Sequence, residues 1–382
     1  MRAKRNAMFM MPGLIKMYEN SVNMMELPGK SAAEADEDFY DTDTLSPGER
    51  EQAMALLAEQ KAAEGSIFIL YPKNCFNLYS GQRPDRFDVV YANEALTGRK
   101  RGEAVARDFE AFLKKHPKVA IDTVVIPGCG SSPLGAAALG KAVAEITGKP
   151  VAAIVAGEGA FDLWMEAGSG GTLMAPMANA LNAFDGVLEL SVKTNPIAKA
   201  WARMYMRDLA ESMHEAATLY ALLRARLIDE QFVLRDPPAR GLDMIVSHSK
   251  GNWNVLVALL NFELELAEKI AENNPRGAKV EKRIDVVTFG NPVDLPDQHE
   301  MMKTLFHYHQ FAGTSDLLMW ANSSKTLLSR ILLAGKVNSV RPFDPKEDPD
   351  ERLFHGCRHD LIRKREGHMP IEDILSAIRA AA

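Results

Sequence analysis

The chain has few of the features that mark membrane proteins and disulfide-rich proteins. Its 382 residues include three cysteines, Cys75, Cys129 and Cys357, and no two of them have the C-x-x-C spacing. This pattern predicts neither a zinc site nor a disulfide framework, and the odd, low count fits a reducing compartment. No stretch approaches the roughly 18 apolar residues that a transmembrane helix needs.

A complete signal peptide and a basic surface are also missing. The apolar run after the basic N-terminus has only about five residues, fewer than the 7–15 of a signal-peptide core. Net charge is −6, and basic residues do not form long blocks. A nucleic-acid partner is therefore not expected, because binding phosphates needs a concentrated basic face. We expect a soluble, cytoplasmic protein, although a secretion route that uses no cleaved signal stays open.

Strand-like and helix-like segments alternate through most of the chain. Such alternation predicts an α/β fold, with a mostly parallel sheet that has helices on both faces. Strands are expected at residues 67–71, 86–91, 122–126, 151–155, 243–246, 283–289, 306–311 and 337–341. Helices are expected at residues 51–64, 102–115, 134–146, 252–266 and 371–381.

Two regions depart from this alternation. Residues 1–64 are expected to form an N-terminal extension with one helix, which Ser46-Pro47-Gly48-Glu49 opens. Within it, the acidic run Glu34–Asp43 is expected to be a solvated loop. Residues 65–382 form the α/β domain, and residues 160–240 form a helical insertion in it. The glycine loop Gly168–Gly171 lacks the lysine and hydroxyl residue of a phosphate-binding P-loop. A protein that binds a phosphate ligand is therefore only a weak alternative.

The segment 243–252 joins a predicted strand to a predicted helix through a turn of only a few residues. So sharp a bend forces Ser249 into a strained backbone angle and needs small neighbours, here Ser247 and Gly251. The pattern S-x-S-x-G resembles the nucleophile elbow G-x-S-x-G of the α/β-hydrolases, with Ser247 in place of the first glycine. The alternative is a serine-rich turn before a helix. The resemblance implies that Ser249 is a nucleophile.

Downstream segments resemble further parts of an α/β-hydrolase in the expected order. Thr288-Phe289-Gly290-Asn291-Pro292 is similar to the T-F-G-x-P turn of lipases. Gly313-Thr314-Ser315-Asp316-x-Leu318 resembles the turn that presents the acid of a catalytic triad, and this implies that Asp316 orients the catalytic histidine. A helix cap is the alternative role for Asp316.

The catalytic histidine of this family comes last in the chain. Three histidines follow the last predicted strand: His355, His359 and His368. His359 resembles the histidine of a G-x-x-H-x-L turn, and His368 resembles that of a G-H-x-P-x-E turn before the final helix. His359 is slightly favoured over His368, His355 ranks third, and at least two of the three are surface or capping residues.

Backbone amides are expected to form the oxyanion hole. One is that of Lys250, the residue after Ser249, and the other is that of Cys129 or Gly130, in a loop that resembles H-G-x-G of esterases. Proline stands where that motif has histidine. The Lys250 side chain could aid an anionic substrate or point to solvent. Cys129 as nucleophile is a rival hypothesis, but it lies on no evident elbow.

The resemblance implies a lipase- or esterase-like serine hydrolase that cleaves a carboxylic ester of a small molecule or lipid. It implies a Ser-His-Asp triad, no cofactor, no metal, and inserted helices at 160–240 that form a lid over the site. An acyltransferase or thioesterase with the same site is one alternative. A non-catalytic hydrolase-fold protein that binds a partner through the insertion is another.

Overall fold

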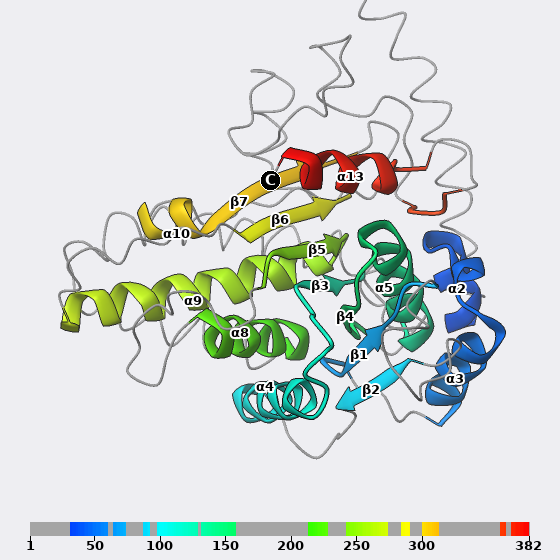
Figure 1. The fold of residues 1–382 in the computed structure, drawn as a ribbon, viewed down its shortest axis with the longest axis horizontal. Coiled ribbons are helices and arrows are strands. Elements are labelled where there is room, and N and C mark those ends of the chain that lie inside the picture. The colour runs from blue at the N-terminus through cyan, green and yellow to red at the C-terminus, as the bar shows by residue number, and fades with distance from the viewer. Residues whose placement is uncertain are drawn as a thin grey trace, which may run out of the picture.

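A seven-stranded sheet forms the centre of the computed structural model (Figure 1). The structure describes residues 31–59, 64–73, 87–91, 98–128, 131–157, 213–227, 242–273, 284–290, 300–312, 360–363 and 368–381. Its strand order is β2-β1-β4-β3-β5-β6-β7. The strands are β1 (Ile67–Leu70), β2 (Asp88–Tyr91), β3 (Thr123–Ile126), β4 (Val151–Ile154), β5 (Met244–His248), β6 (Ile284–Phe289) and β7 (Phe306–Phe311).

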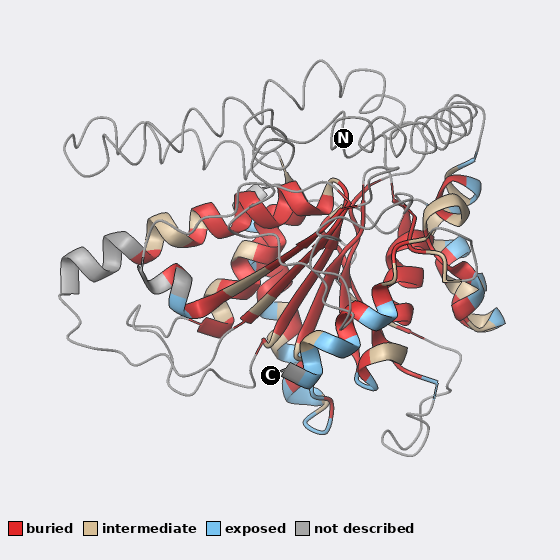
Figure 2. Ribbon diagram, turned by 90° about the horizontal axis from the view of Figure 1, so that it is seen from above, coloured by how far each residue is buried: buried red, intermediate tan, exposed pale blue. Residues whose placement is uncertain are grey.

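The sheet is mostly parallel. Neighbouring strands from β4 through β3, β5 and β6 to β7 pair in parallel. Only β1 runs the other way, and it pairs antiparallel with both β2 and β4. Strands β1, β3, β4 and β5 are buried throughout, as expected for strands with both faces covered (Figure 2). The α/β class with a mostly parallel sheet is confirmed.

Helices cover both faces of the sheet. Alternate residues of each strand enter different core clusters, so Ile67 and Ile69 pack on one face and Phe68 and Leu70 on the other. The first face is covered by α4 (Gly98–Lys115), α8 (His214–Leu227) and α9 (Gly251–Asn273). The second is covered by α5 (Pro133–Thr147) and α13 (Ile371–Ala381), and α10 (Glu300–Leu305) precedes β7.

The N-terminal segment carries two helices, α2 (Ala32–Phe39) and α3 (Pro47–Ala58), with a short 3₁₀ turn (Thr42–Thr44) between them. Both helices begin with a capping box, at Ser31 with Glu34 and at Ser46 with Glu49. The prediction of a solvated loop at Glu34–Asp43 is wrong, because α2 packs on α5 and Asp36 is buried.

Within the 160–240 insertion the structure describes residues 213–227, where α8 packs between α4 and α9. Leu219, Leu222 and Leu223 of α8 are fully buried in the first core cluster. The strand expected at 337–341 and the glycine loop Gly168–Gly171 lie outside the described residues. None of the described helices combines the length and the apolar composition that a transmembrane span requires.

Candidate active site

The strand order reverses between β3 and β5, and this places a candidate site at their carboxyl ends. The chain passes from β3 to β4 on one side and from β5 to β6 and β7 on the other. In open α/β sheets, ligands bind outside the carboxyl ends of the strands at such a switch point. Ile126 at the end of β3 pairs with Ser247 of β5, so Pro127 and Gly128 emerge beside Ser249.

Ser249 occupies a strained position in the turn between β5 and α9. Only Ser249 and Lys250 separate the two elements. Ser249 has a φ of 53°, and it is the one non-glycine residue in the described part of the chain with a positive φ. A side chain in this left-handed region costs of order 1–3 kcal/mol, and such residues cluster at functional sites. This is the backbone angle expected for Ser249 from its motif.

Hydrogen bonds to the end of β6 hold this turn. The backbone N–H of Ser249 donates to the carbonyl of Phe289 at 2.9 Å. The Nδ2 group of Asn252 donates to the same carbonyl at 2.9 Å, and the Ser247 hydroxyl donates to Asn252 Oδ1 at 2.7 Å. Ser247, at the first glycine position of the motif, therefore links the strand before the turn to the helix after it.

Two glycines allow the turn and the loop after β3 to approach each other. A Cβ atom at Gly251 would lie 2.5 Å from the carbonyl oxygen of Ile126 and 2.6 Å from that of Pro127. A Cβ atom at Gly128 would lie 2.9 Å from Cβ of Ser249. The glycine two residues after Ser249 is thus required by close packing against β3.

A tyrosine from the N-terminal segment lies in the same place. The Tyr40 hydroxyl accepts a hydrogen bond from the Gly128 N–H at 2.6 Å and lies 2.8 Å from Nδ1 of His248. Since the N–H of Gly128 uses a lone pair of the hydroxyl, the tyrosine can donate its own proton to His248. Tyr40 and His248 are both buried, and their rings meet edge to face. Tyr40 therefore ties the loop after β3 to the residue before Ser249.

Asp36 of α2 holds the other end of this loop. Its carboxylate accepts hydrogen bonds from the hydroxyls of Ser131 and Ser132 and from the Ser132 N–H. Burial raises the pKa of Asp36 from 3.8 to about 7, and the hydrogen bonds from Ser132, Gly135 and Ser131 oppose that rise. Asp36 and Tyr40 lie one helical turn apart and together hold Gly128, Ser131 and Ser132.

The Lys250 side chain points toward the insertion and is not directed to solvent. Its Nζ lies 3.9 Å from Oε1 of Glu215 near the start of α8, and the two side chains are 13% and 2% exposed. Of the two roles considered for this cation, pointing to solvent is wrong. The contact also shows that α8 reaches the residue that follows Ser249.

The predicted site residues are only partly within the described structure. Ser249 and Lys250 lie at the switch point, whereas Asp316, His359, Cys129 and Gly130 lie outside the described residues. His368 is partly buried in the short segment before α13. The next residue, Met369, donates its N–H to the carbonyl of Asp360 at 3.1 Å.

Sequence reasoning missed the residues that support this loop: Asp36, Tyr40 and His248. The Ser31-x-x-Glu34 pattern is the same capping box that identified the helix after Ser46. It would have predicted α2, which carries Asp36 and has Tyr40 as its C-terminal cap. No local pattern predicts that Tyr40 contacts His248, 208 positions later.

No family model, no curated protein and no solved structure matches the chain. The chemistry of the site therefore has to be inferred from its own residues.

Proposed function

We propose that this protein is a serine hydrolase of the α/β-hydrolase type that cleaves a carboxylic ester of a small molecule or lipid. The observation that carries the proposal is the left-handed backbone of Ser249 in a two-residue turn between β5 and α9. That turn lies at the switch point of the sheet, where such folds bind ligands. The S-x-S-x-G pattern indicates a nucleophile elbow only when its central serine lies in a strained turn between a strand and a helix, as Ser249 does.

In the proposed reaction, the Ser249 hydroxyl attacks the acyl carbon and passes its proton to an imidazole. His359 or His368 supplies that imidazole, and Asp316 orients it. The same imidazole then protonates the departing alcohol, which leaves an acyl group on Ser249. Water attacks this acyl group, its proton goes to the imidazole and back to Ser249, and the carboxylic acid is released.

The oxyanion that forms during attack needs hydrogen-bond donors on one side of Ser249. The amide of Lys250 stands at the start of α9, where the helix dipole favours negative charge. The second amide is proposed to come from Cys129 or Gly130, in the loop after β3. Gly128 packs against Ser249 in that loop, and this close approach supports the assignment. The proposed chemistry uses no metal ion and no organic cofactor.

The insertion is proposed to cover the site as a lid. α8 itself packs in the core, so the lid is proposed for the rest of the insertion. The contact of Glu215 with Lys250 brings the start of α8 to the residue after the nucleophile. Only 6% of Ser249 is exposed, so the proposed nucleophile is already sheltered from solvent.

Covalent labelling with a small fluorophosphonate tests the proposal. We expect one labelled residue, Ser249, and complete loss of labelling in Ser249→Ala. Ser247→Gly is the matched control, because it removes a neighbouring hydroxyl and restores the glycine of the motif, and it should still be labelled. Labelling that persists in Ser249→Ala would exclude Ser249 as the nucleophile. A folded wild-type chain that is never labelled would favour a non-catalytic binding protein.

Comparison of two single variants identifies the base. If only one of His359→Ala and His368→Ala loses labelling, that histidine is the proton acceptor. Asp316→Asn should also slow labelling, because the histidine loses the carboxylate that orients it. If both histidine variants are labelled at the wild-type rate, the proposed triad is wrong. Release of free acid, measured with and without an added alcohol or thiol, separates hydrolysis from acyl transfer.

A further inference from the structure

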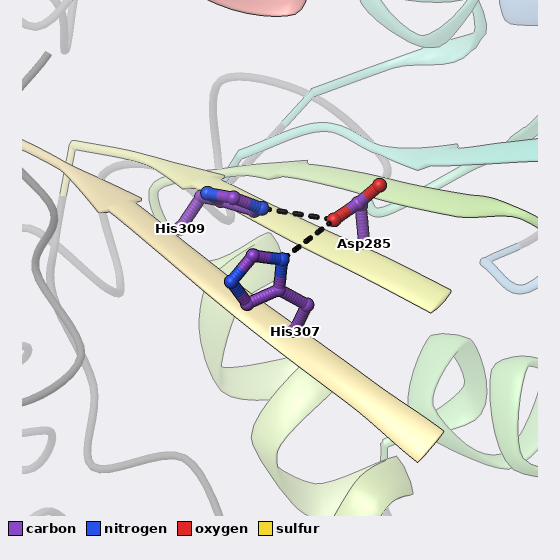
Figure 3. Close-up of side chains that lie close together, drawn as sticks. All are labelled: Asp285, His307 and His309. Carbon is purple, nitrogen blue, oxygen red and sulfur yellow. Dashed lines mark hydrogen bonds and ion pairs between the residues drawn. The ribbon is translucent and has the colours of Figure 1, made fainter. Parts of the chain in front are cut away.

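A second group of chemically active side chains lies on β6 and β7, toward the end of the strands that is opposite to the Ser249 turn. Asp285 comes from β6, and His307 and His309 come from β7 (Figure 3). Asp285 pairs with Met244 at the start of β5, whereas His248 at the end of β5 pairs with Phe289. Along β6, Asp285 therefore lies four residues, about 13 Å, before Phe289, the residue next to the Ser249 turn.

The three side chains converge on one point because of the sheet register. Asp285 is paired directly with His307, and His309, two residues on, projects from the same face of β7. One oxygen of Asp285, Oδ1, lies 2.9 Å from Nε2 of His309 and 3.2 Å from Nδ1 of His307. All three ligand atoms lie within 4.8 Å of one another.

We propose that Asp285, His307 and His309 bind one divalent transition-metal ion, and that this ion is Zn²⁺. Zinc is held by imidazole nitrogens and carboxylate oxygens at about 2.0–2.2 Å, which places neighbouring ligand atoms of a tetrahedral site about 3.3–3.6 Å apart. The two separations from Asp285, 2.9 Å and 3.2 Å, lie within a few tenths of an ångström of this range. Two neutral imidazoles and one carboxylate are borderline ligands that suit Zn²⁺ and are poorly suited to Mg²⁺ or Ca²⁺.

The surroundings fit an ion that keeps one open position. The side chains of His309, Asp285 and His307 are 8%, 15% and 27% exposed, so the group is mostly buried but still reached by solvent at His307. Three protein ligands leave a fourth place for water. Because the ligands stand on two paired strands, their positions are fixed more firmly than they would be on loops.

The proposed ion joins β6 to β7 and takes no part in the reaction at Ser249. Without metal, His309 Nε2 donates a hydrogen bond to Asp285 and His307 Nδ1 lies 3.2 Å from the same oxygen, so a proton on each of these nitrogens suits the carboxylate. Zinc replaces both protons at these nitrogens. The inference does not depend on the proposed hydrolase activity.

Zinc titration of the full chain, after removal of metal with a chelator, tests the proposal. We expect one Zn²⁺ bound per chain through this site. Loss of an outer-shell partner weakens metal binding by about 10–100-fold, so loss of a ligand itself in Asp285→Ala or His309→Ala should weaken it by about 100-fold or more. Of the three variants, His307→Ala should disturb folding least, because His307 is the most exposed of the three side chains. It should show the same loss. His116→Ala, at the end of α4, is the matched control and should bind like wild type.

Two readouts distinguish a metal site from a hydrogen-bonded cluster. In the ¹⁵N spectrum, zinc should shift Nδ1 of His307 and Nε2 of His309, and the melting temperature of wild type should rise while that of Asp285→Ala stays unchanged. Unchanged zinc affinity in all three variants, or no binding by the wild-type chain, would overturn the proposal. Labelling of Ser249 should be the same with and without zinc, so either proposal can fail alone.

Discussion

At the scale of single residues, Ser249 shows how local strain and chemistry are linked. A side chain at a φ of 53° crowds its own backbone, and the turn keeps it there through the Ser249 amide and the Asn252 side chain, both bonded to Phe289. Glycine would fit this angle without crowding. The turn itself therefore does not require serine, which is consistent with the proposed role of its hydroxyl.

Replacement of Ser249 should separate stability from activity. Ser249→Gly and Ser249→Ala both remove the hydroxyl and should both abolish labelling. Only glycine relieves the backbone strain, so its free energy of unfolding should exceed that of Ser249→Ala by about 1 kcal/mol. Urea unfolding of the two variants measures this difference. Equal stabilities would mean that the turn relaxes its backbone angle when the side chain is small.

At the scale of elements, a buried ion pair joins the N-terminal segment to the sheet. Lys141 of α5 donates to Glu49 of α3 at 2.7 Å and to the carbonyl of Tyr71 at 2.8 Å. The two charged side chains are 1% and 0% exposed. Neither charge can regain water if the other is removed, so the pair fixes where α3 docks on α5.

Breaking this pair on one side should be costly. Lys141→Met leaves the Glu49 carboxylate buried without its cation, and the free energy of unfolding should fall by about 3–5 kcal/mol. Adding Glu49→Gln removes the stranded charge and should recover part of the loss. The exposed pair of Arg50 with Glu37 is the control, and Arg50→Ala should cost at most about 1 kcal/mol. Equal losses for Lys141→Met and Arg50→Ala, measured by urea unfolding, would contradict this account.

At the scale of the whole molecule, residues 31–59 are part of the same core as the sheet. Tyr40, Leu45 and Ala53 belong to the cluster that covers one face of the sheet. Two buried polar residues, Asp36 and Tyr40, reach the loop at the switch point from this segment. The candidate site is therefore assembled from two segments far apart in the chain, one that carries Asp36 and Tyr40 and one that carries His248 and Ser249.

The buried carboxyl of Asp36 should make the stability of the molecule depend on pH. Its pKa is raised by burial to about 7 in the folded chain, against 3.8 when the carboxyl is in water, so the folded state holds the proton more tightly. The stability from this group is complete below pH 3.8 and is lost as the pH rises to about 7, at up to about 1.4 kcal/mol per pH unit. Asp36→Asn cannot lose a proton.

Urea unfolding of wild type and Asp36→Asn between pH 4 and pH 8 checks this. The free energy of unfolding of wild type relative to the variant should fall across this range and level off above about pH 7. A relative stability that stays level or rises with pH would show that Asp36 is charged in the folded chain.

Much of the fold could be predicted because its signals are local. The alternating and apolar runs that predicted strands at 67–71, 122–126 and 283–289 correspond to β1, β3 and β6. Less could be predicted where the partner is distant. The antiparallel pairing of β1 with β4 and the contact of Tyr40 with His248 depend on which segments meet in space. The acidic composition of residues 34–43 favoured a loop, but the burial of Asp36 against α5 decided otherwise.

The sequence by itself determined most of the strands and helices and the sharp turn at Ser249, because periodicity and small neighbours act over a few residues. Only the tertiary structure decided the strand order, the place of Tyr40 and Asp36 beside the loop, and the meeting of Asp285 with His307 and His309. These depend on register and docking between distant segments, which are set by how the whole core packs.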